Sequence, residues 1–149
     1  MSRDLRVAGY AATFDQPNER REVLRRGAFA TQEWPLFLLA DHVVGRPSYA
    51  SSRRGTLETQ EDGYGLWFQA TLDDDAEGFE MWCLIRFAGV TGISVGGSGW
   101  QHRQEGRLKA FVCMPIYELS VLTSGGPRFP GTWVAPLDDA RRRRLEMRS

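Results

Sequence analysis

The chain has 149 residues and a formal net charge of zero, with 42% hydrophobic and 11% aromatic residues. This length and composition indicate one globular domain that buries roughly two-thirds of its unfolded surface. The balanced charge argues against nucleic acid or a membrane surface as the main partner, and no apolar run is long enough for a membrane span. The amino-terminal residues lack the apolar stretch of a signal peptide, so we expect synthesis in the cytoplasm.

The first third of the chain predicts two strands with a polar segment between them. Residues 5–14 alternate small and large apolar side chains, which is typical of a strand. Residues 27–34 predict a helical turn or short helix that Pro35 closes. The apolar run 36–42 ends in Asp41 and His42, as a buried strand would when it emerges at a site.

The remainder predicts a hairpin, one helix and the last strands. Two period-2 segments, 55–62 and 65–72, are separated by glycines and favour a hairpin, and 73–89 carries the start and stop signals of a helix. Residues 90–97 and 108–125 supply strands, the second divided at Pro115. We therefore expect a β-rich α+β domain over 1–136, a closed or nearly closed β-barrel flanked by a few helices, and a charged, Arg-rich tail over 137–149.

The chain contains two histidines, His42 and His102, which narrows the search for a general base because histidine is the commonest one. His42 follows a run too apolar for a surface loop, although on residue type alone a core or strand-end histidine with one hydrogen bond is the more common role. His102 lies in a polar stretch that is typical of a solvated hairpin. His42 is thus the candidate base.

Glu118 is an acid in the apolar segment around Pro115. On a straight strand it shares a face with the four apolar residues Val112, Met114, Ile116 and Leu122, and a carboxylate buried there must be paired. One interpretation is a structural ion pair with an arginine. The other is that Glu118 accepts a hydrogen bond from a histidine N–H and orients the ring.

Ser94 lies in the segment GISVGG, which spells the G-x-S-x-G pattern of α/β-hydrolases. The strand–turn–helix context of that pattern is missing, because no helix is predicted after the serine. Turn chemistry is one explanation for this serine. Together with His42 and Glu118, however, Ser94 makes nucleophilic acyl transfer plausible.

Several segments resemble the tailed-phage (HK97-type) prohead maturation proteases, which are related in fold to the herpesvirus assemblin serine proteases. The resemblance covers roughly residues 8–134 and rests on short motifs in a common order: GYAATF, EVLRRGAFA, LLADHVVGR, GTLETQEDGYGLWFQATL, GISVGG and IYELSVLT. One departure concerns Gly97, the residue directly after the second glycine of the G-x-S-x-G pattern. The family carries a phenylalanine at this position.

The resemblance implies a herpesvirus-protease-like barrel and a serine endopeptidase without metal or cofactor. In it Ser94 matches the nucleophile, His42 the base and Glu118 the third member. The implied substrates are scaffold protein, the scaffold-like amino-terminal segment of the major capsid protein, and the protease itself. The implied location is the immature capsid in the host cytoplasm, and self-association is also compatible with the resemblance.

Two other interpretations stay open at this point. A catalytically degenerate β-barrel module could serve as a scaffold or assembly partner in a capsid or gene-transfer particle. The basic segment ARRRRLEMR could bind nucleic acid, but the rest of the chain has no basic stripe to support such a role.

Overall fold

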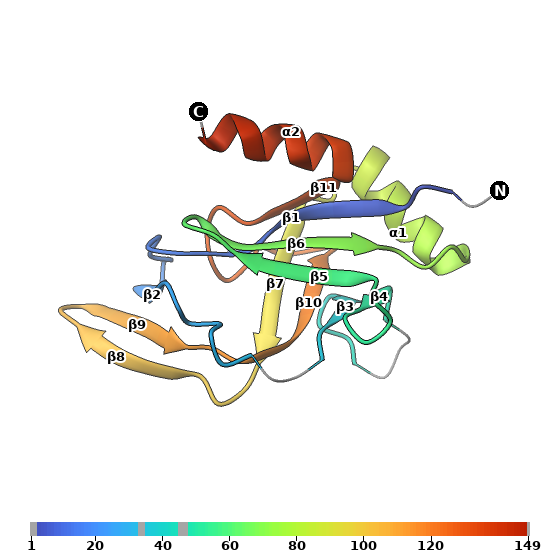
Figure 1. Ribbon diagram of the computed structural model, residues 1–149. Helices are drawn as coiled ribbons and strands as arrows, with labels where there is room; N and C mark the ends of the chain where they lie inside the picture. The colour runs from blue at the N-terminus through green and yellow to red at the C-terminus, as the bar shows by residue number, and fades with distance from the viewer. Residues whose placement is uncertain (1–2, 33–34, 45–47, 149) are drawn as a thin grey trace.

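The computed structural model describes residues 3–32, 35–44 and 48–148, and within them it has a β-rich α+β fold (Figure 1). The elements, in chain order, are β1 (Arg6–Thr13), β2 (Glu22–Leu24), β3 (Phe37–Ala40), β4 (Ala50–Ser51), β5 (Leu57–Glu61), β6 (Gly65–Thr71), α1 (Ala76–Phe87), β7 (Gly92–Gly97), β8 (Gln101–Glu105), β9 (Leu108–Cys113), β10 (Ile116–Leu122), β11 (Trp133–Pro136) and α2 (Leu137–Arg148). No helix in these ranges is long and apolar enough to cross a membrane. Pro115 separates β9 from β10, as the sequence predicts.

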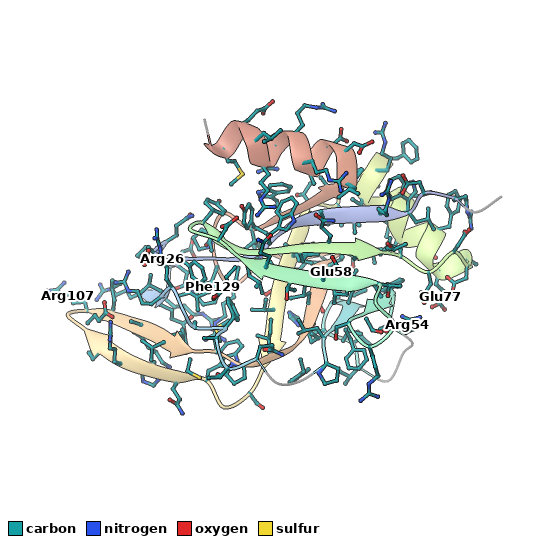
Figure 2. All side chains as sticks on the ribbon, viewed as in Figure 1. Arg26, Arg54, Glu58, Glu77, Arg107 and Phe129 are labelled. Carbon is teal, nitrogen blue, oxygen red and sulfur yellow. The ribbon has the colours of Figure 1, made fainter. Side chains whose placement is uncertain are left out.

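The strands pair into three sheets, with the orders β11-β1-β6-β5, β4-β3-β10-β7 and β2-β9-β8. Most neighbours are antiparallel, but β10 is parallel to β3 and β9 is parallel to β2. The third sheet forms an arm that extends from the body of the molecule, and Figure 2 shows Arg107 at the tip of its hairpin. The second sheet carries Ser94 on β7 and Glu118 on β10, and His42 follows its strand β3.

The closed barrel expected from the sequence is not found among the strand pairings of the described residues, which form open sheets. The first two sheets meet at two corners through isolated hydrogen bonds, from Thr56 N to Ser51 O (3.0 Å) and from Val134 N to Thr91 O (3.0 Å). Next to the second corner, the Thr132 hydroxyl donates to Ile93 O (3.0 Å). In a closed barrel, a backbone N–H of a neighbouring strand would donate to the Ile93 carbonyl. Here the Thr132 hydroxyl donates to it instead.

The main core lies between the first two sheets and the helix α1. Val7 and Phe68 contribute from the first sheet, Leu38 and Leu119 from the second, and all four are fully buried. The helix α1 begins at the N-cap Asp75, whose carboxylate accepts from Gly78 N (2.8 Å), and it buries Met81 and Ile85 against this core. The sheet that carries the site is thus fixed on its inner face by apolar packing.

The helix α2 packs on the outer face of the first sheet over a second, aromatic cluster. Leu137 and Ala140 are buried there, and the guanidinium carbons of Arg143 and Arg144 lie 4.2 Å from the ring centroids of Trp133 and Trp67, respectively. Such cation–π contacts contribute about 0.5–2 kcal/mol each. Part of the arginine-rich segment therefore serves to hold α2 on the sheet.

Asp62 anchors α2 through a partly buried hydrogen-bond network. Its carboxylate accepts from the Tyr10 hydroxyl, from Arg144 Nη2 (2.9 Å) and from the backbone N–H of Tyr64 (2.8 Å) and Gly65 (3.1 Å). Burial alone would raise the pKa of Asp62, but these hydrogen bonds outweigh it and lower the pKa from its ordinary 3.8 to about 2.

We predict that this carboxylate contributes an acid-sensitive part of the stability. Because the pKa of Asp62 is lower in the folded chain, its contribution is complete above about pH 4 and is lost as the pH falls through 2. The shift corresponds to roughly 2 kcal/mol. Urea unfolding at a series of pH values should show a smaller loss of stability below pH 4 in Asp62→Asn than in the wild type. The exposed Asp139→Asn is the control, and equal pH dependence in Asp62→Asn and wild type would contradict the prediction.

Candidate active site

Two of the three predicted site residues lie on neighbouring strands of the second sheet, and the third lies in the turn after a further strand of it. Strand β10 carries Glu118, the antiparallel strand β7 carries Ser94, and the parallel strand β3 leads into His42 two residues after its end. Register places Ser94 opposite Ser120 and Gly96 opposite Glu118. Because side chains alternate between the faces of a strand, Ser94, Glu118 and Ser120 lie on one face of this sheet.

The turn after β3 directs the His42 side chain back toward that face. Asp41 and His42 both adopt left-handed backbone conformations, with φ of 51° and 59°. Each such conformation costs about 1–3 kcal/mol for a non-glycine residue, so the surroundings must hold it. They do so through Asp41: its N–H donates to Val121 O (2.9 Å), and its carboxylate accepts from both the backbone N–H (2.8 Å) and the hydroxyl of Thr123.

Glu118 is buried, with a side chain 3% exposed, and its carboxylate contacts two partners. Oε1 binds His42 Nδ1, and Oε2 accepts from the Ser120 hydroxyl at 2.6 Å. Of the two interpretations of this acid, pairing with histidine is the one found, and no arginine contacts it within the described residues. A carboxylate at Nδ1 favours the tautomer in which Nε2 of His42 carries the free lone pair.

Gly96 provides the space that the Glu118 carboxylate occupies. A Cβ atom at this position would lie 1.9 Å from Glu118 Oε1 and 2.8 Å from the carboxyl carbon. A side chain on Gly96 is therefore incompatible with the observed position of the acid. The second glycine of the G-x-S-x-G spelling is thus explained by packing against Glu118 and not by a nucleophile elbow.

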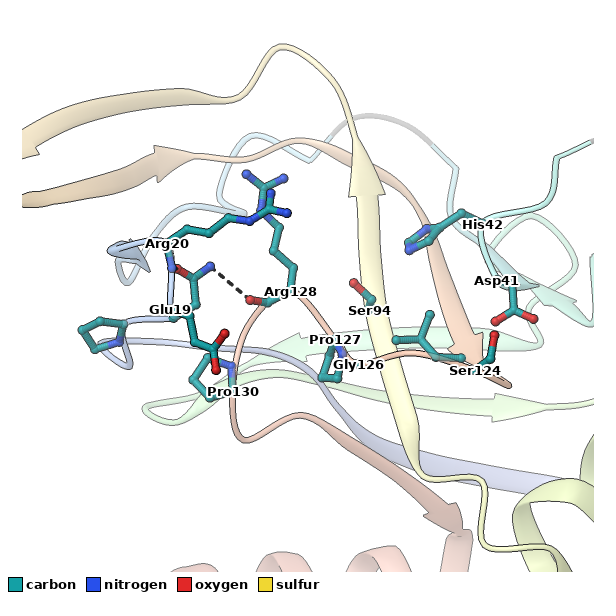
Figure 3. Close-up of a pocket in the computed structure, with 13 residues that line it drawn as sticks. Glu19, Arg20, Asp41, His42, Ser94, Ser124, Gly126, Pro127, Arg128 and Pro130 are labelled. Atoms are coloured by element: carbon teal, nitrogen blue, oxygen red, sulfur yellow. Dashed lines mark hydrogen bonds between the residues drawn. The ribbon is translucent and has the colours of Figure 1, made fainter.

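Ser94 and His42 line the same open cavity, of about 880 Å³ (Figure 3). The serine is 6% exposed, and its Oγ makes no hydrogen bond within the described part of the chain, including to His42. In the view of Figure 3, Ser94 stands between the His42 ring and Arg128. Ser94 thus lines the cavity without a hydrogen-bond partner for its hydroxyl among the described residues.

A second cavity, of about 550 Å³, adjoins the first, and His42 and Arg128 line both. Arg128 is held by a bidentate ion pair with Glu22, at 2.7 and 3.1 Å, and its guanidinium carbon lies 5.0 Å from the ring centroid of Trp100. This pair lowers the pKa of Glu22, because the hydrogen bond from Arg128 stabilises its carboxylate. The two cavities together form a groove that His42 and Arg128 both line.

The backbone of Pro115 and Ile116, together with the Trp100 ring, leaves room only for glycine at position 97. A Cβ on Gly97 would lie 2.9 Å from Trp100 Nε1 and 2.1 Å from Pro115 O, and the indole N–H donates to that same carbonyl at 2.8 Å. The space next to the backbone is therefore already filled by an aromatic ring. In this chain Trp100, from the segment after β7, provides an aromatic wall of the second cavity.

The second histidine lies away from this groove. His102 is exposed on strand β8 of the arm. Its ring packs edge-on against that of Phe111, and the two ring centroids are 6.1 Å apart. No group of three or more His, Cys, Asp or Glu side chains suited to a metal ion occurs among the described residues.

Sequence reasoning missed Ser120, and it noticed Asp41 only as the neighbour of His42. A usable signal for Ser120 was its position two residues after Glu118, which places both side chains on one face of a strand. For Asp41 the signal is weaker: aspartate and histidine are residue types that tolerate left-handed conformations.

Comparison with protein-family models gives a match over nearly the whole chain. A protein-family model described as caudovirus prohead serine protease matches residues 2–146 of the 149 residues and so includes most of α2. The search of curated proteins gives no significant match.

Proposed function

The chain belongs to the caudovirus prohead serine protease family, and from this premise we propose that Ser94, His42 and Glu118 form the catalytic triad of a capsid maturation endopeptidase. The contact between Glu118 and His42 Nδ1, on the sheet face that carries Ser94, is the observation that supports this proposal most directly. The serine and the histidine also line one cavity. The alternative, a degenerate module for assembly, has no comparable support from these residues.

In the proposed mechanism the free Nε2 of His42 takes the Ser94 proton as Oγ attacks the scissile carbonyl carbon. Glu118 keeps the imidazole in the required tautomer and stabilises the imidazolium that forms. The imidazolium then protonates the departing amine, and the C–N bond breaks to leave an acyl-enzyme on Ser94. Water, deprotonated by His42, releases the acyl group. Backbone N–H groups of the glycine-rich stretch are the proposed donors to the oxyanion.

We propose scaffold protein, or the scaffold-like amino-terminal segment of the major capsid protein, as the substrate, and the protease itself as a further one. Two open cavities that share His42 as a lining residue support an extended polypeptide over a small molecule as the substrate. The proposed setting is the immature capsid in the host cytoplasm. No cofactor takes part in the proposed reaction.

Co-expression with the major capsid protein and scaffold from the same genome tests this function. We expect truncated products of one of them, with the cleavage sites located by mass spectrometry. His102→Ala should cleave within about twofold of the wild type, because an exposed side chain outside the groove contributes little. Intact partner proteins with the folded wild type would contradict the proposed function, and loss of cleavage in His102→Ala would contradict the choice of His42.

A further inference from the structure

A buried serine connects the proposed acid with the backbone of the proposed base. Ser120 is 0% exposed, and its Oγ lies 2.6 Å from Glu118 Oε2 and 2.9 Å from the backbone nitrogen of His42. We propose that Ser120 is a positioning residue, which fixes both Glu118 and the His42 turn for the reaction. This inference rests on the proposed function, since it concerns the same triad.

Hydrogen-bond chemistry fixes the direction of both contacts. The backbone N–H of His42 can only donate, so the Ser120 oxygen must accept from it. Ser120 therefore uses its single hydroxyl proton to donate a hydrogen bond to the carboxylate of Glu118, which can only accept while ionised. A serine at this position donates one hydrogen bond and accepts another. An alanine would leave the His42 N–H and the Glu118 carboxylate oxygen without this buried partner.

His42 is therefore held on β10 by two side-chain contacts, one to its ring and one to its backbone. Glu118 holds the ring at Nδ1, and Ser120 holds the main chain of the same residue. This main chain has a φ of 59°, a conformation that an unheld residue leaves easily. Because the two points are two residues apart on one strand, the ring and its backbone keep a fixed position relative to β10 and hence to Ser94 on β7.

The arrangement also separates the roles of the two serines that face each other across β7 and β10. The Ser120 hydroxyl is enclosed and engaged in two hydrogen bonds, whereas Ser94 Oγ lines the cavity and makes none within the described residues. A nucleophile must reach the substrate carbonyl, and only Ser94 is placed to do so. Ser120 therefore acts through Glu118 and His42.

The experiment compares purified wild type with Ser120→Ala, with Ser120→Cys, and with the control Ser51→Ala. Ser51 is a similarly buried serine (2% exposed) on β4, where its hydroxyl accepts from Arg54 and not from the triad. The probe is a fluorophosphonate, whose fluoride leaves as a serine oxygen bonds to phosphorus. Labelling rates, thermal unfolding and the proton NMR signal of His42 Nδ1–H are measured for each variant.

We expect Ser120→Ala to lower the labelling rate of Ser94 on the order of 10²-fold, as misplacement of a catalytic group by about 1 Å does. Ser120→Cys, with a weaker donor of similar size, should fall between alanine and wild type. The His42 Nδ1–H signal should shift or broaden in Ser120→Ala and stay unchanged in Ser51→Ala, although both lose similar thermal stability.

Wild-type rates and an unchanged His42 signal in the folded Ser120→Ala variant would overturn the inference. Equal losses of labelling in Ser120→Ala and Ser51→Ala, with no change at His42, would also overturn it, because they would indicate a purely structural role. If the folded wild type does not react with the probe but its His42 signal still depends on Ser120, the proposed function fails while the positioning stands.

Discussion

Replacing Ser94 with alanine is expected to abolish cleavage of the co-expressed capsid or scaffold protein while leaving the fold intact. Ser94 Oγ has no hydrogen-bond partner in the described residues, so its removal leaves no buried group unsatisfied. Stability should therefore change by less than about 1 kcal/mol. Loss of a serine nucleophile lowers turnover on the order of 10⁶-fold, which is below detection in a co-expression assay.

The matched control is Ser98→Ala, in the same glycine-rich segment. Ser98 is exposed, lies just after the end of β7, and lines the second cavity and not the cavity that Ser94 lines. Its variant should cleave at close to the wild-type rate. Products of unchanged mass and amount with Ser94→Ala would show that another residue is the nucleophile, and cleavage lost only with Ser98→Ala would identify a different serine.

Local sequence patterns were sufficient to predict most of the secondary structure. The alternation over 5–14, the two segments around Gly63 and Gly65, and the capping signal at Asp75 correspond to β1, the β5–β6 hairpin and α1. These patterns depend on neighbours within a few residues. Closure of a barrel depends on pairing between distant strands, and here the Thr132 hydroxyl takes the carbonyl of Ile93 at one corner. No local sequence pattern predicts that a side-chain hydroxyl, and not a backbone N–H, donates to this carbonyl.

The candidate site shows the same limit. Glu118 was recognisable because an acid on an apolar face needs a partner, and its contact with His42 is observed. The left-handed turn at Asp41 and His42 and the bridge made by Ser120 were not recognisable, because they depend on parallel pairing of β3 with β10, about 80 residues apart. In the same way, the glycine at 97 is explained by the Pro115 carbonyl on the paired strand segment and by the Trp100 ring beside it.

Gly96→Ala is the second substitution expected to have a large effect, and it tests the acid without changing it. The new methyl group would coincide with Glu118 Oε1, so the carboxylate must move away from His42 Nδ1. The clash involves the end of a side chain and not the backbone, which allows the fold to persist. We expect cleavage to fall on the order of 10²-fold or more, because the imidazole loses the group that orients it.

The control for this substitution is Gly63→Ala, in the β5–β6 turn, where an added Cβ meets no atom within 4 Å. Both variants lose the same backbone freedom in the unfolded chain, so a difference in activity between them reflects the Glu118 contact. Thermal unfolding should show both folded, and the His42 Nδ1–H signal should shift in Gly96→Ala alone. Wild-type cleavage by Gly96→Ala with a displaced Glu118 would mean that the reaction does not need the acid. The proposed triad would then reduce to Ser94 and His42.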